Sequence, residues 1–284
     1  MQNIEHVKKK INLHFGNLEK NEFVNSLISK IKPEKIFHLA AQSNIMKSFE
    51  EPIKTIQTNF FGTLNLLEAI RKTSIDPVIM LSSSSDVYGI VNKKEIPIKE
   101  TVQANPISPY GVSKSTVELL MIQYFQTYGL KSFGIRAFPH TGPRRSALFA
   151  ESSFAKQIVE IKKNQRKFVN VGNLEIVRTY TDVRDMVEAY WVGIKKCKFG
   201  QIYNVGNEKP IELSEVLEKL IKLSKSEIKI KKKEQLLRVK DTNNHIPNIN
   251  KFKKQTNWKP KIPLEKTLND LLDYWGKMLS NKKY

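Results

Sequence analysis

Short apolar runs alternate with longer segments of helical periodicity, and this alternation constrains the fold more than any other feature of the chain. The helix expected at 50–73, for example, places Ile56, Phe60, Leu64 and Leu67 on one face. Strands that alternate with helices in this way form a doubly wound parallel sheet, so the sequence predicts an α/β fold. The predicted strands are 11–15, 35–41, 77–82, 131–138 and 201–205, and the predicted helices are one ending at Ile31 and those at 50–73, 110–128, 152–163, 179–195, 213–224 and 264–279.

The strand predicted at 77–82 leads into a run of four serines followed by Asp86. A hydroxyl at the carboxyl end of a parallel strand lies where open α/β sheets bind ligands. Downstream, Tyr110 and Lys114 are four residues apart, which places them about 5–6 Å apart on one helix face. An ammonium beside a phenol favours the phenolate and makes the tyrosine a better proton donor and acceptor. Serine, tyrosine and lysine so placed suit transfer of a hydride and a proton to or from a sugar carbonyl, although a solvated lysine one turn after a packed tyrosine is the alternative.

The composition narrows the class of protein. The net charge of +20 is spread along the chain without interleaved aromatic residues, which argues against nucleic-acid binding. The densest basic run, 229–233, alternates like an edge strand. Cys197 is the only cysteine, and no apolar stretch approaches the roughly 20 residues of a membrane span. We therefore expect a cytoplasmic protein without a disulfide, a metal site or a membrane segment.

Several segments together identify a resemblance. The chain resembles the extended short-chain dehydrogenase/reductase family of nucleotide-sugar enzymes, which includes the NAD-dependent epimerases and dehydratases. Within that family it is most similar to GDP-4-dehydro-6-deoxy-D-mannose reductases, and next to GDP-mannose 4,6-dehydratases. The resemblance covers essentially the whole chain and rests on LAAQS at 39–43, NFFGT at 59–63, SSSSDVYG at 82–89, SPYGVSK at 108–114, RAF at 136–138, HTGP at 140–143, FAKQI at 154–158, RTYTDVRDMV at 178–187 and WKP at 258–260.

One departure from the family is large. Family members open with a strand and a glycine-rich turn whose backbone amides hold the cofactor pyrophosphate. No two of the 12 glycines in this sequence are three residues apart, so no such turn exists. We therefore expect an N-terminally incomplete sheet, and a truncated or split gene product or a misplaced start codon.

The resemblance implies a Rossmann-like doubly wound sheet with a smaller C-terminal α/β domain that binds the nucleotide sugar. The expected NAD(P)-binding domain covers 1–138 and about 176–206, without the family's first βαβ unit. The expected substrate domain covers 139–175 and 207–284. Family members are commonly homodimers or homotetramers, and the resemblance implies the same here.

The resemblance also implies roles for individual residues. Tyr110 is the expected general acid, Lys114 lowers its pKa and holds the nicotinamide ribose, and Ser84 positions the C4 oxygen of the sugar. The backbone near these groups is expected to be supported by Asn59, for which a buried polar anchor is the alternative. The other residues implied are Asn17, Ala40, Ala41 and Ser43 at the cofactor, Arg178 and Arg238 at the nucleotide diphosphate, and Asp86 as a possible base.

The resemblance leaves three functions open. The first is reduction of GDP-4-dehydro-6-deoxy-D-mannose with NADPH, or alternatively NADH. The second is the 4,6-dehydration of GDP-mannose, in which Asp86 removes the C5 proton. The third is a non-catalytic remnant or split subunit that needs a partner chain to supply the missing strands.

Overall fold

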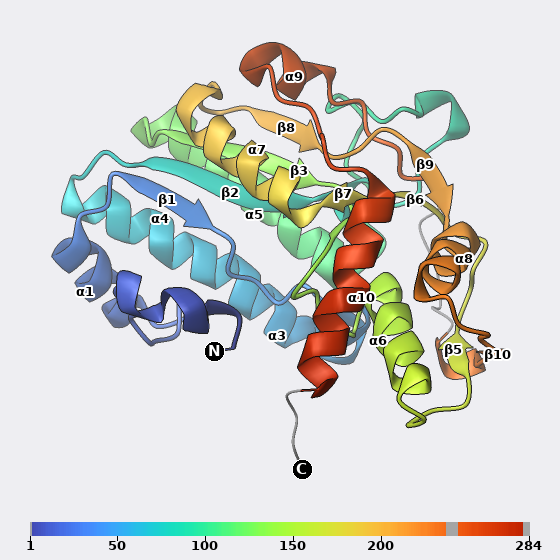
Figure 1. Ribbon diagram of the computed structural model, residues 1–284. Coiled ribbons are helices and arrows are strands. Elements are labelled where there is room, and N and C mark those ends of the chain that lie inside the picture. Colours follow the sequence, from blue (N-terminus) through green and yellow to red (C-terminus); the bar gives the residue numbers. More distant parts are fainter. Residues whose placement is uncertain (1, 237–243, 281–284) are drawn as a thin grey trace.

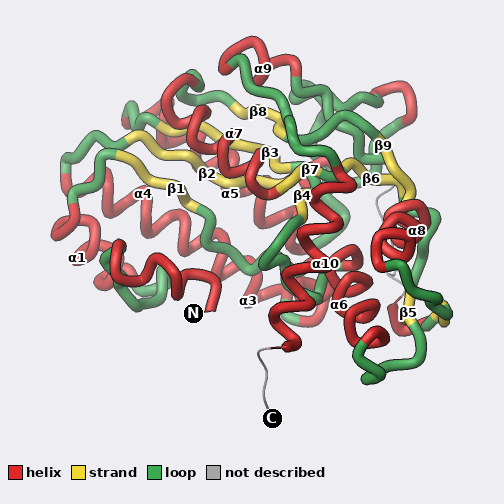
Figure 2. The backbone as a smooth tube through the Cα atoms, viewed as in Figure 1, coloured by secondary structure: helices red, strands yellow, loops and turns green. Residues whose placement is uncertain are grey.

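The computed structural model describes residues 2–236 and 244–280 and contains one main parallel sheet. Its strand order is β1-β2-β3-β8, with every neighbouring pair parallel. Figures 1 and 2 show the four strands side by side, with helices on both faces. The predicted α/β fold with a doubly wound parallel sheet is confirmed. The strands are β1 (Lys35–His38), β2 (Val78–Ser84), β3 (Ser132–Ala137) and β8 (Ile202–Val205).

Apolar faces of helices cover both sides of this sheet. On one side α1 (Asn21–Ile31), α4 (Gly62–Thr73) and α5 (Pro109–Tyr128) form a core around Ile79 and Leu81 of β2. On the other side α7 (Val183–Lys196) and α9 (Asn250–Thr256) pack over Phe133 and Ile135 of β3. Burial of these side chains, at about 25 cal/mol per Å² of apolar surface, holds the layers together.

A second hydrophobic core lies beside the sheet, among three helices that Figure 1 shows to one side of it. Phe154, Leu217 and Leu268 are almost fully buried there. The basic run at 229–233 contributes the short exposed strand predicted for it, and that strand pairs with a buried one. The elements are α6 (Ala150–Lys162), α8 (Leu213–Ser224), α10 (Leu264–Ser280), β5 (Val169–Val171) and β10 (Ile230–Lys232), and two further strand pairs join β4 (His140–Thr141) to β7 (Thr181–Asp182) and β6 (Val177–Thr179) to β9 (Pro210–Glu212).

The prediction of a strand at 11–15 is wrong. Residues Gln2–Lys10 form a 3-10 helix, and 11–16 have no regular structure. An isolated strand cannot satisfy its backbone donors and acceptors, and this segment has no strand beside it. Apolar alternation alone therefore did not produce a strand here.

Two predicted helices also differ in their bounds. The helix expected at 50–73 is interrupted: Pro52–Ile56 is α-helical, Gln57–Phe61 is a π-helical turn, and α4 follows. A short helix, Ile45–Glu50, precedes them. The helix expected from 179 begins four residues later, because Asp182 caps it by accepting the amide of Arg184 at 2.8 Å. The residues before the cap are extended.

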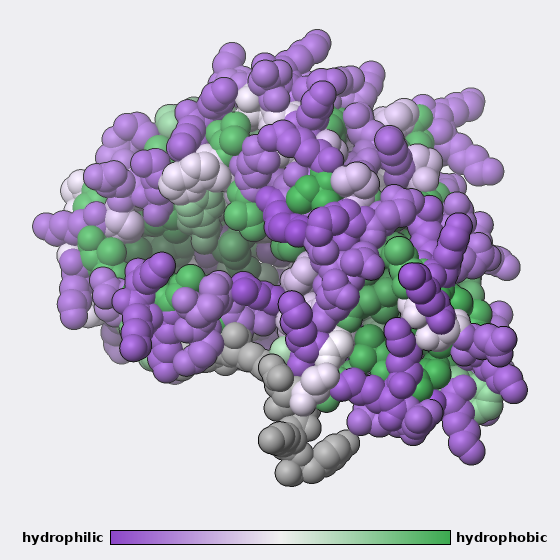
Figure 3. Space-filling model, in the orientation of Figure 1, coloured by the Kyte–Doolittle hydropathy of each residue, from purple (hydrophilic) through white to green (hydrophobic). Residues whose placement is uncertain are grey.

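The outer edge of β1 is open. Among the described residues β1 pairs only with β2, and a hollow of about 410 Å³ lies along it. Figure 3 shows apolar side chains lining a hollow in this region, between α1 and α7. Leu39 is 54% exposed and Trp191, on α7, is 51% exposed. An unpaired strand edge beside exposed apolar surface is a site that folded proteins normally cover.

Candidate active site

The carboxyl end of β2 and the start of α5 meet at one point. Strand β2 ends at Ser84, which begins the 3-10 helix Ser85–Tyr88. Helix α5 begins after Ser108, whose hydroxyl accepts the Gly111 amide at 3.0 Å. A Cβ at Gly111 would lie 2.7 Å from the carbonyl oxygen of Asp86, so glycine permits the two turns to touch. This close approach places Tyr110 beside the end of β2.

Tyr110 is buried, with 7% of its surface exposed. Burial raises the pKa of its phenol, the negative charge of Asp86 raises it further, and the nearby Ser84 hydroxyl only partly opposes them. Asp86 is itself bonded to Ser84, whose Oγ lies 2.9 Å from the Asp86 Oδ2. The phenol therefore carries its proton at neutral pH, although burial and Asp86 make it a weaker acid than a free tyrosine.

Lys114 is also buried, one helical turn beyond Tyr110. Its Nζ donates to the Ser82 carbonyl oxygen at 2.7 Å and lies 5.9 Å from the centroid of the Tyr110 ring. Burial lowers the pKa of Lys114 to about 8, and Glu118 partly opposes this shift. The expected lowering of the tyrosine pKa is not the net result, because burial and Asp86 outweigh the other influences on the phenol.

Asn59 ties the segment after β1 to α5. Its Oδ1 accepts the Gln42 amide at 2.7 Å, and its Nδ2 donates to the Gln42 carbonyl at 3.0 Å and to the Ser113 hydroxyl at 2.8 Å. Asn59 is buried in the π-helical turn. The same segment carries Ala40 and Ser43, which are exposed, and Ala41, which is half-buried. The structure thus holds this segment of small side chains against the helix that carries Tyr110 and Lys114.

The predicted arginines and Asn17 differ in their placement. Arg178 lies in β6, and burial followed by the charge of Arg178 lowers the pKa of His245, while the charge of Asp86 opposes this shift. Arg178 and Asp86 therefore both lie near His245. Arg238 lies outside the described residues. Asn17 is exposed in the turn before α1 and accepts the Glu19 amide at 2.9 Å.

Glu118, Arg136 and His38 are buried polar residues that were not predicted as site residues. They lie next to the Tyr110 cluster, which consists of Ser84, Asp86, Tyr110 and Lys114. Glu118 lies one turn beyond Lys114, and its carboxylate pairs with Arg136 at 2.7 Å. His38 ends β1 and contacts the Thr63 hydroxyl at 2.9 Å, and burial followed by the charge of Lys114 lowers its pKa to about 4. The helical spacing of Tyr110, Lys114 and Glu118 was the available signal for the first of them.

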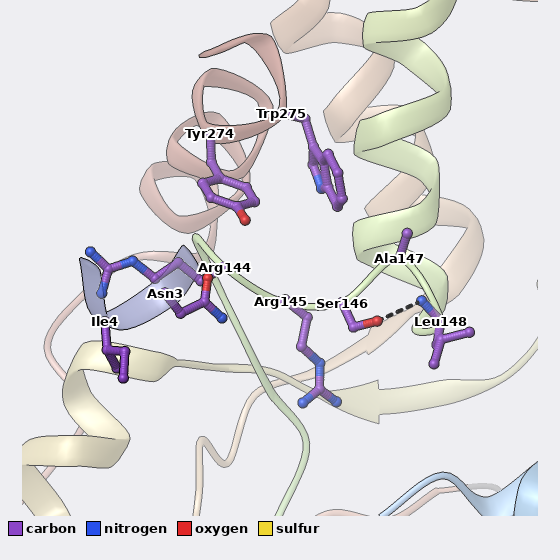
Figure 4. A pocket seen from close by; sticks show the side chains of 9 residues that line it. All are labelled: Asn3, Ile4, Arg144, Arg145, Ser146, Ala147, Leu148, Tyr274 and Trp275. Carbon is purple, nitrogen blue, oxygen red and sulfur yellow. Dashed lines mark hydrogen bonds between the residues drawn. The ribbon is translucent and has the colours of Figure 1, made fainter. Parts of the chain in front are cut away.

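A separate cavity of about 760 Å³ lies where the N-terminal 3-10 helix, the loop before α6 and α10 meet (Figure 4). Arg144 and Arg145 line it together with Tyr274 and Trp275. The Arg145 guanidinium lies over the Phe149 ring, 3.3 Å from its centroid, and its charge also reaches Tyr110. Arg145 therefore links this cavity to the Tyr110 cluster.

Two other kinds of feature do not occur in residues 2–236 and 244–280. No three His, Cys, Asp or Glu side chains lie close enough together to hold a metal ion. No helix in the same ranges is long and apolar enough to cross a membrane.

Comparisons with known proteins agree on one family. The family described as GDP-mannose 4,6 dehydratase matches residues 1–271. The GDP-6-deoxy-D-mannose reductase of Pseudomonas aeruginosa is 31% identical over 86% of this chain and 80% of its own length. The GDP-mannose 4,6-dehydratase of Vibrio cholerae is 31% identical over 65% of this chain, which spans about half of that relative's length.

A solved structure matches the fold closely. The structure of RMD from Pseudomonas aeruginosa complexed with NADPH superposes with a TM-score of 0.89 and 27% identity. The match covers 98% of this chain and 95% of the other. By its sequence and its fold, the chain belongs to the GDP-mannose 4,6-dehydratase family, within the extended short-chain dehydrogenases/reductases.

Proposed function

We propose that the chain is an NADPH-dependent reductase that acts on the C4 carbonyl of GDP-4-dehydro-6-deoxy-D-mannose. One observation carries the proposal: Tyr110 is buried and kept protonated at the end of β2, beside Ser84 and one turn from Lys114. Reduction of a carbonyl needs such a proton donor. The similarity to the Pseudomonas reductase, and the NADPH bound in the RMD structure, support the substrate and the cofactor.

The residues after β1 fit the nicotinamide end of a dinucleotide. Ala40, Ala41 and Ser43 have small side chains that leave the carboxyl end of the strand open, and Lys114 is a buried cation nearby. We propose that they hold the nicotinamide riboside, with Asn17 toward the adenine. When bound, the cofactor supplies the hydride that the carbonyl carbon accepts.

The chain's own residues handle the proton. The Tyr110 hydroxyl donates its proton to the C4 oxygen of the sugar, and the Ser84 hydroxyl turns its hydrogen from Asp86 to the same oxygen. The carbonyl gains one hydride and one proton and becomes a hydroxyl. The Lys114 ammonium favours the phenolate that remains, because the two charges are opposite. The burial of both side chains keeps water from competing for the proton.

The diphosphate of the substrate needs cations outside this cluster. We propose that Arg178 binds it, because a guanidinium matches the geometry of phosphate oxygens and Arg178 lies near His245, whose pKa Asp86 also influences. Arg238 is assigned to the same diphosphate from the resemblance alone.

A dehydratase is the second candidate, and Asp86 is the observation that favours it. Its carboxylate lies at the end of β2, bonded to Ser84, where a base is needed to remove a proton from C5 of the sugar. A dehydratase converts GDP-mannose to the 4-keto sugar and regenerates its cofactor. A reductase leaves GDP-mannose unchanged.

The open edge of β1 supports the third candidate, a subunit that needs another polypeptide segment. No glycine-rich turn occurs in the sequence, and the hollow beside β1 is lined by apolar side chains such as Leu39. A segment that covers β1 would supply both backbone hydrogen bonds and a phosphate-binding turn. We expect this chain by itself to bind NADPH weakly.

The quaternary structure, the domain division and the location are further proposals. Exposed apolar side chains lie on the helices around 50–72 and on α5, for example Ile53, Phe61 and Leu119. We propose that these helices form a homodimer or homotetramer. The proposed division into 1–138 with 176–206, and 139–175 with 207–284, is supported by the separate core around α6, α8 and α10, whereas α9 of the second part packs on the main sheet. A cytoplasmic location is proposed from the single cysteine.

One experiment separates the three functions. The purified chain is titrated with NADPH while tryptophan fluorescence is followed, and is then incubated with either the 4-keto sugar or GDP-mannose. Oxidation of NADPH with the 4-keto sugar, but not with GDP-mannose, supports the reductase. Conversion of GDP-mannose without net NADPH oxidation shows a dehydratase instead. Absence of both reactions, together with absence of NADPH binding, supports the incomplete subunit and overturns the enzymatic proposal for this chain.

A further inference from the structure

A third side chain shares the helix face of Tyr110 and Lys114. Glu118 lies four residues beyond Lys114 and is 5% exposed, and the proton-transfer steps above leave it without a role. Most buried carboxylates in proteins are paired, and both oxygens of this one accept hydrogen bonds.

Glu118 joins three elements of the fold. Its Oε1 accepts the Ser83 hydroxyl of β2 at 2.5 Å and the Arg136 Nε of β3 at 2.9 Å. Its Oε2 accepts the Arg136 Nη2 at 2.7 Å. Ser83 and Arg136 are neighbours across the β2–β3 pair, so one carboxylate on α5 fixes both strands at the same level.

The strand residue that Glu118 holds lies between two residues of the candidate site. Side chains of a strand alternate between its faces, so the Ser83 hydroxyl points to α5, and those of Ser82 and Ser84 point the other way. The Ser82 carbonyl accepts the Lys114 ammonium, and Ser84 lies beside Tyr110 and Asp86. A shift at Ser83 would therefore displace both contacts.

We propose that Glu118 is a positioning residue, which fixes the end of β2 through Ser83 and holds Lys114 in its charged form from one helical turn away. Its importance for catalysis rests on the proposed function, whereas its coupling to Lys114 does not. The charge of Glu118 opposes the lowering of the Lys114 pKa that burial causes.

The surroundings of Lys114 allow this coupling to be measured between pH 7 and pH 9. The pKa of Lys114 is about 8, so its charge changes within that range. His38 on β1 has a pKa of about 4 and stays neutral, and burial raises the pKa of Tyr110 on α5 and Tyr190 on α7, so both stay protonated. Burial pulls the pKa of Arg136 on β3 down, but its bonds to Glu118 outweigh this and it stays charged.

The test is a double-mutant cycle between Glu118→Gln and Lys114→Met, with urea unfolding of the whole chain at pH 7 and pH 9. Glutamine keeps the shape and removes the charge. If Glu118 stabilises the charged lysine, Glu118→Gln lowers the urea midpoint more at pH 7 than at pH 9. That difference between the two pH values disappears in the Lys114→Met background. An equal loss at both pH values overturns the proposal and leaves Glu118 a merely structural partner of Arg136.

Two further variants make this result decisive. Glu68→Gln is the matched control, because Glu68 also pairs with an arginine through both oxygens and with a tyrosine hydroxyl, on α4. Glu68→Gln should change the urea midpoint by the same amount in the wild-type and Lys114→Met backgrounds. If Glu118→Gln does not fold, the cycle is repeated in an Arg136→Gln background, where no buried guanidinium is left unpaired.

Activity then tests the catalytic consequence separately. In protein that oxidises NADPH with the 4-keto sugar, Glu118→Gln should lower kcat/KM on the order of 100-fold, because small displacements of catalytic groups have effects of this size. The high-pH limb of its pH profile should also move to lower pH. Coupling in the unfolding cycle without any such activity in the wild-type chain would refute the proposed function and leave this inference standing.

Discussion

The carboxyl end of β2 and the outer edge of β1 differ in how completely their polar groups are paired. At the carboxyl end of β2, Ser82, Ser83 and Ser84 each contact a polar group of the site or its support. Along the outer edge of β1 no described strand pairs with the backbone, and Leu39 faces the surface.

This difference separates the chemistry of the site from its capacity to bind. Proton transfer depends on groups that the chain holds rigidly, among them Tyr110 and Lys114. Binding of a pyrophosphate depends on backbone amides at a glycine-rich turn, and the sequence contains no such turn. We therefore expect the chain to hold its proton-transfer groups in place but to bind the cofactor weakly.

The largest expected effect is on turnover and comes from Tyr110→Phe. Loss of the proton donor should lower kcat about 10²- to 10⁴-fold, because general acid catalysis contributes factors of this size. NADPH oxidation in the presence of the 4-keto sugar measures turnover, and fluorescence titration should show nearly unchanged nucleotide binding. The control is Tyr124→Phe on the same helix, whose hydroxyl bonds Glu68 at 2.7 Å and contacts no proposed site residue. Activity retained in Tyr110→Phe would mean that the polar end of β2 is not the active site.

The next largest effect is on stability and concerns Lys114. Its pKa is lowered from 10.5 to about 8 in the folded chain, so the unfolded state binds more protons between these values. The free energy of unfolding contributed by this group therefore rises with pH through that range, by up to about 3 kcal/mol. Lys114→Met should remove the rise.

The measurement is urea unfolding of the wild type and Lys114→Met from pH 7 to pH 9.5. Subtracting the two curves removes the opposite trend from buried groups such as Cys197, whose pKa burial raises to about 12. If the free energies of unfolding of the two proteins change with pH in parallel, burial does not lower the pKa of Lys114.

A smaller effect is expected at Asn59, which joins the segment after β1 to α5. Asn59→Ala removes the acceptor of the Gln42 backbone amide and the donor to the Gln42 carbonyl, at a cost of about 1–3 kcal/mol for buried polar groups. Thermal unfolding measures the loss. Asn65→Ala, which removes one bond to the Leu18 carbonyl, is the control and should cost less. If the two variants lose the same stability, Asn59 does not anchor the segment after β1.

The smallest effect on stability is expected at the open edge. Leu39→Lys should change the free energy of unfolding by less than about 0.5 kcal/mol, because the side chain is already 54% exposed. A charge at a strand edge opposes association, so light scattering should show less aggregation than in the wild type. Val24→Lys, at a buried position of α1, should prevent folding and serves as the contrast. A large loss of stability in Leu39→Lys would show that this edge is covered.

The local patterns predicted most of the fold for a simple reason. Burial on both faces makes the first half of β2, residues 78–81, a continuous apolar run, and the amphipathic helices that cover the sheet have a clear period. The segment 11–15 has an alternating apolar pattern but is irregular, because a strand forms only where a neighbour accepts its hydrogen bonds. The late start of α7 follows from the cap at Asp182, which hydropathy does not reveal.

The sequence by itself determined the parallel sheet, the helix that carries Tyr110 and Lys114, and the family, because these depend on periodicity and on motifs with short spacing. Only the tertiary structure decided the protonation of the site and its support. Burial raises the pKa of Tyr110 against the expected influence of Lys114, and Glu118 meets Ser83 and Arg136 from 35 and 18 residues away. Desolvation and long-range pairing depend on what surrounds a side chain in space, which the order of residues along the chain does not state.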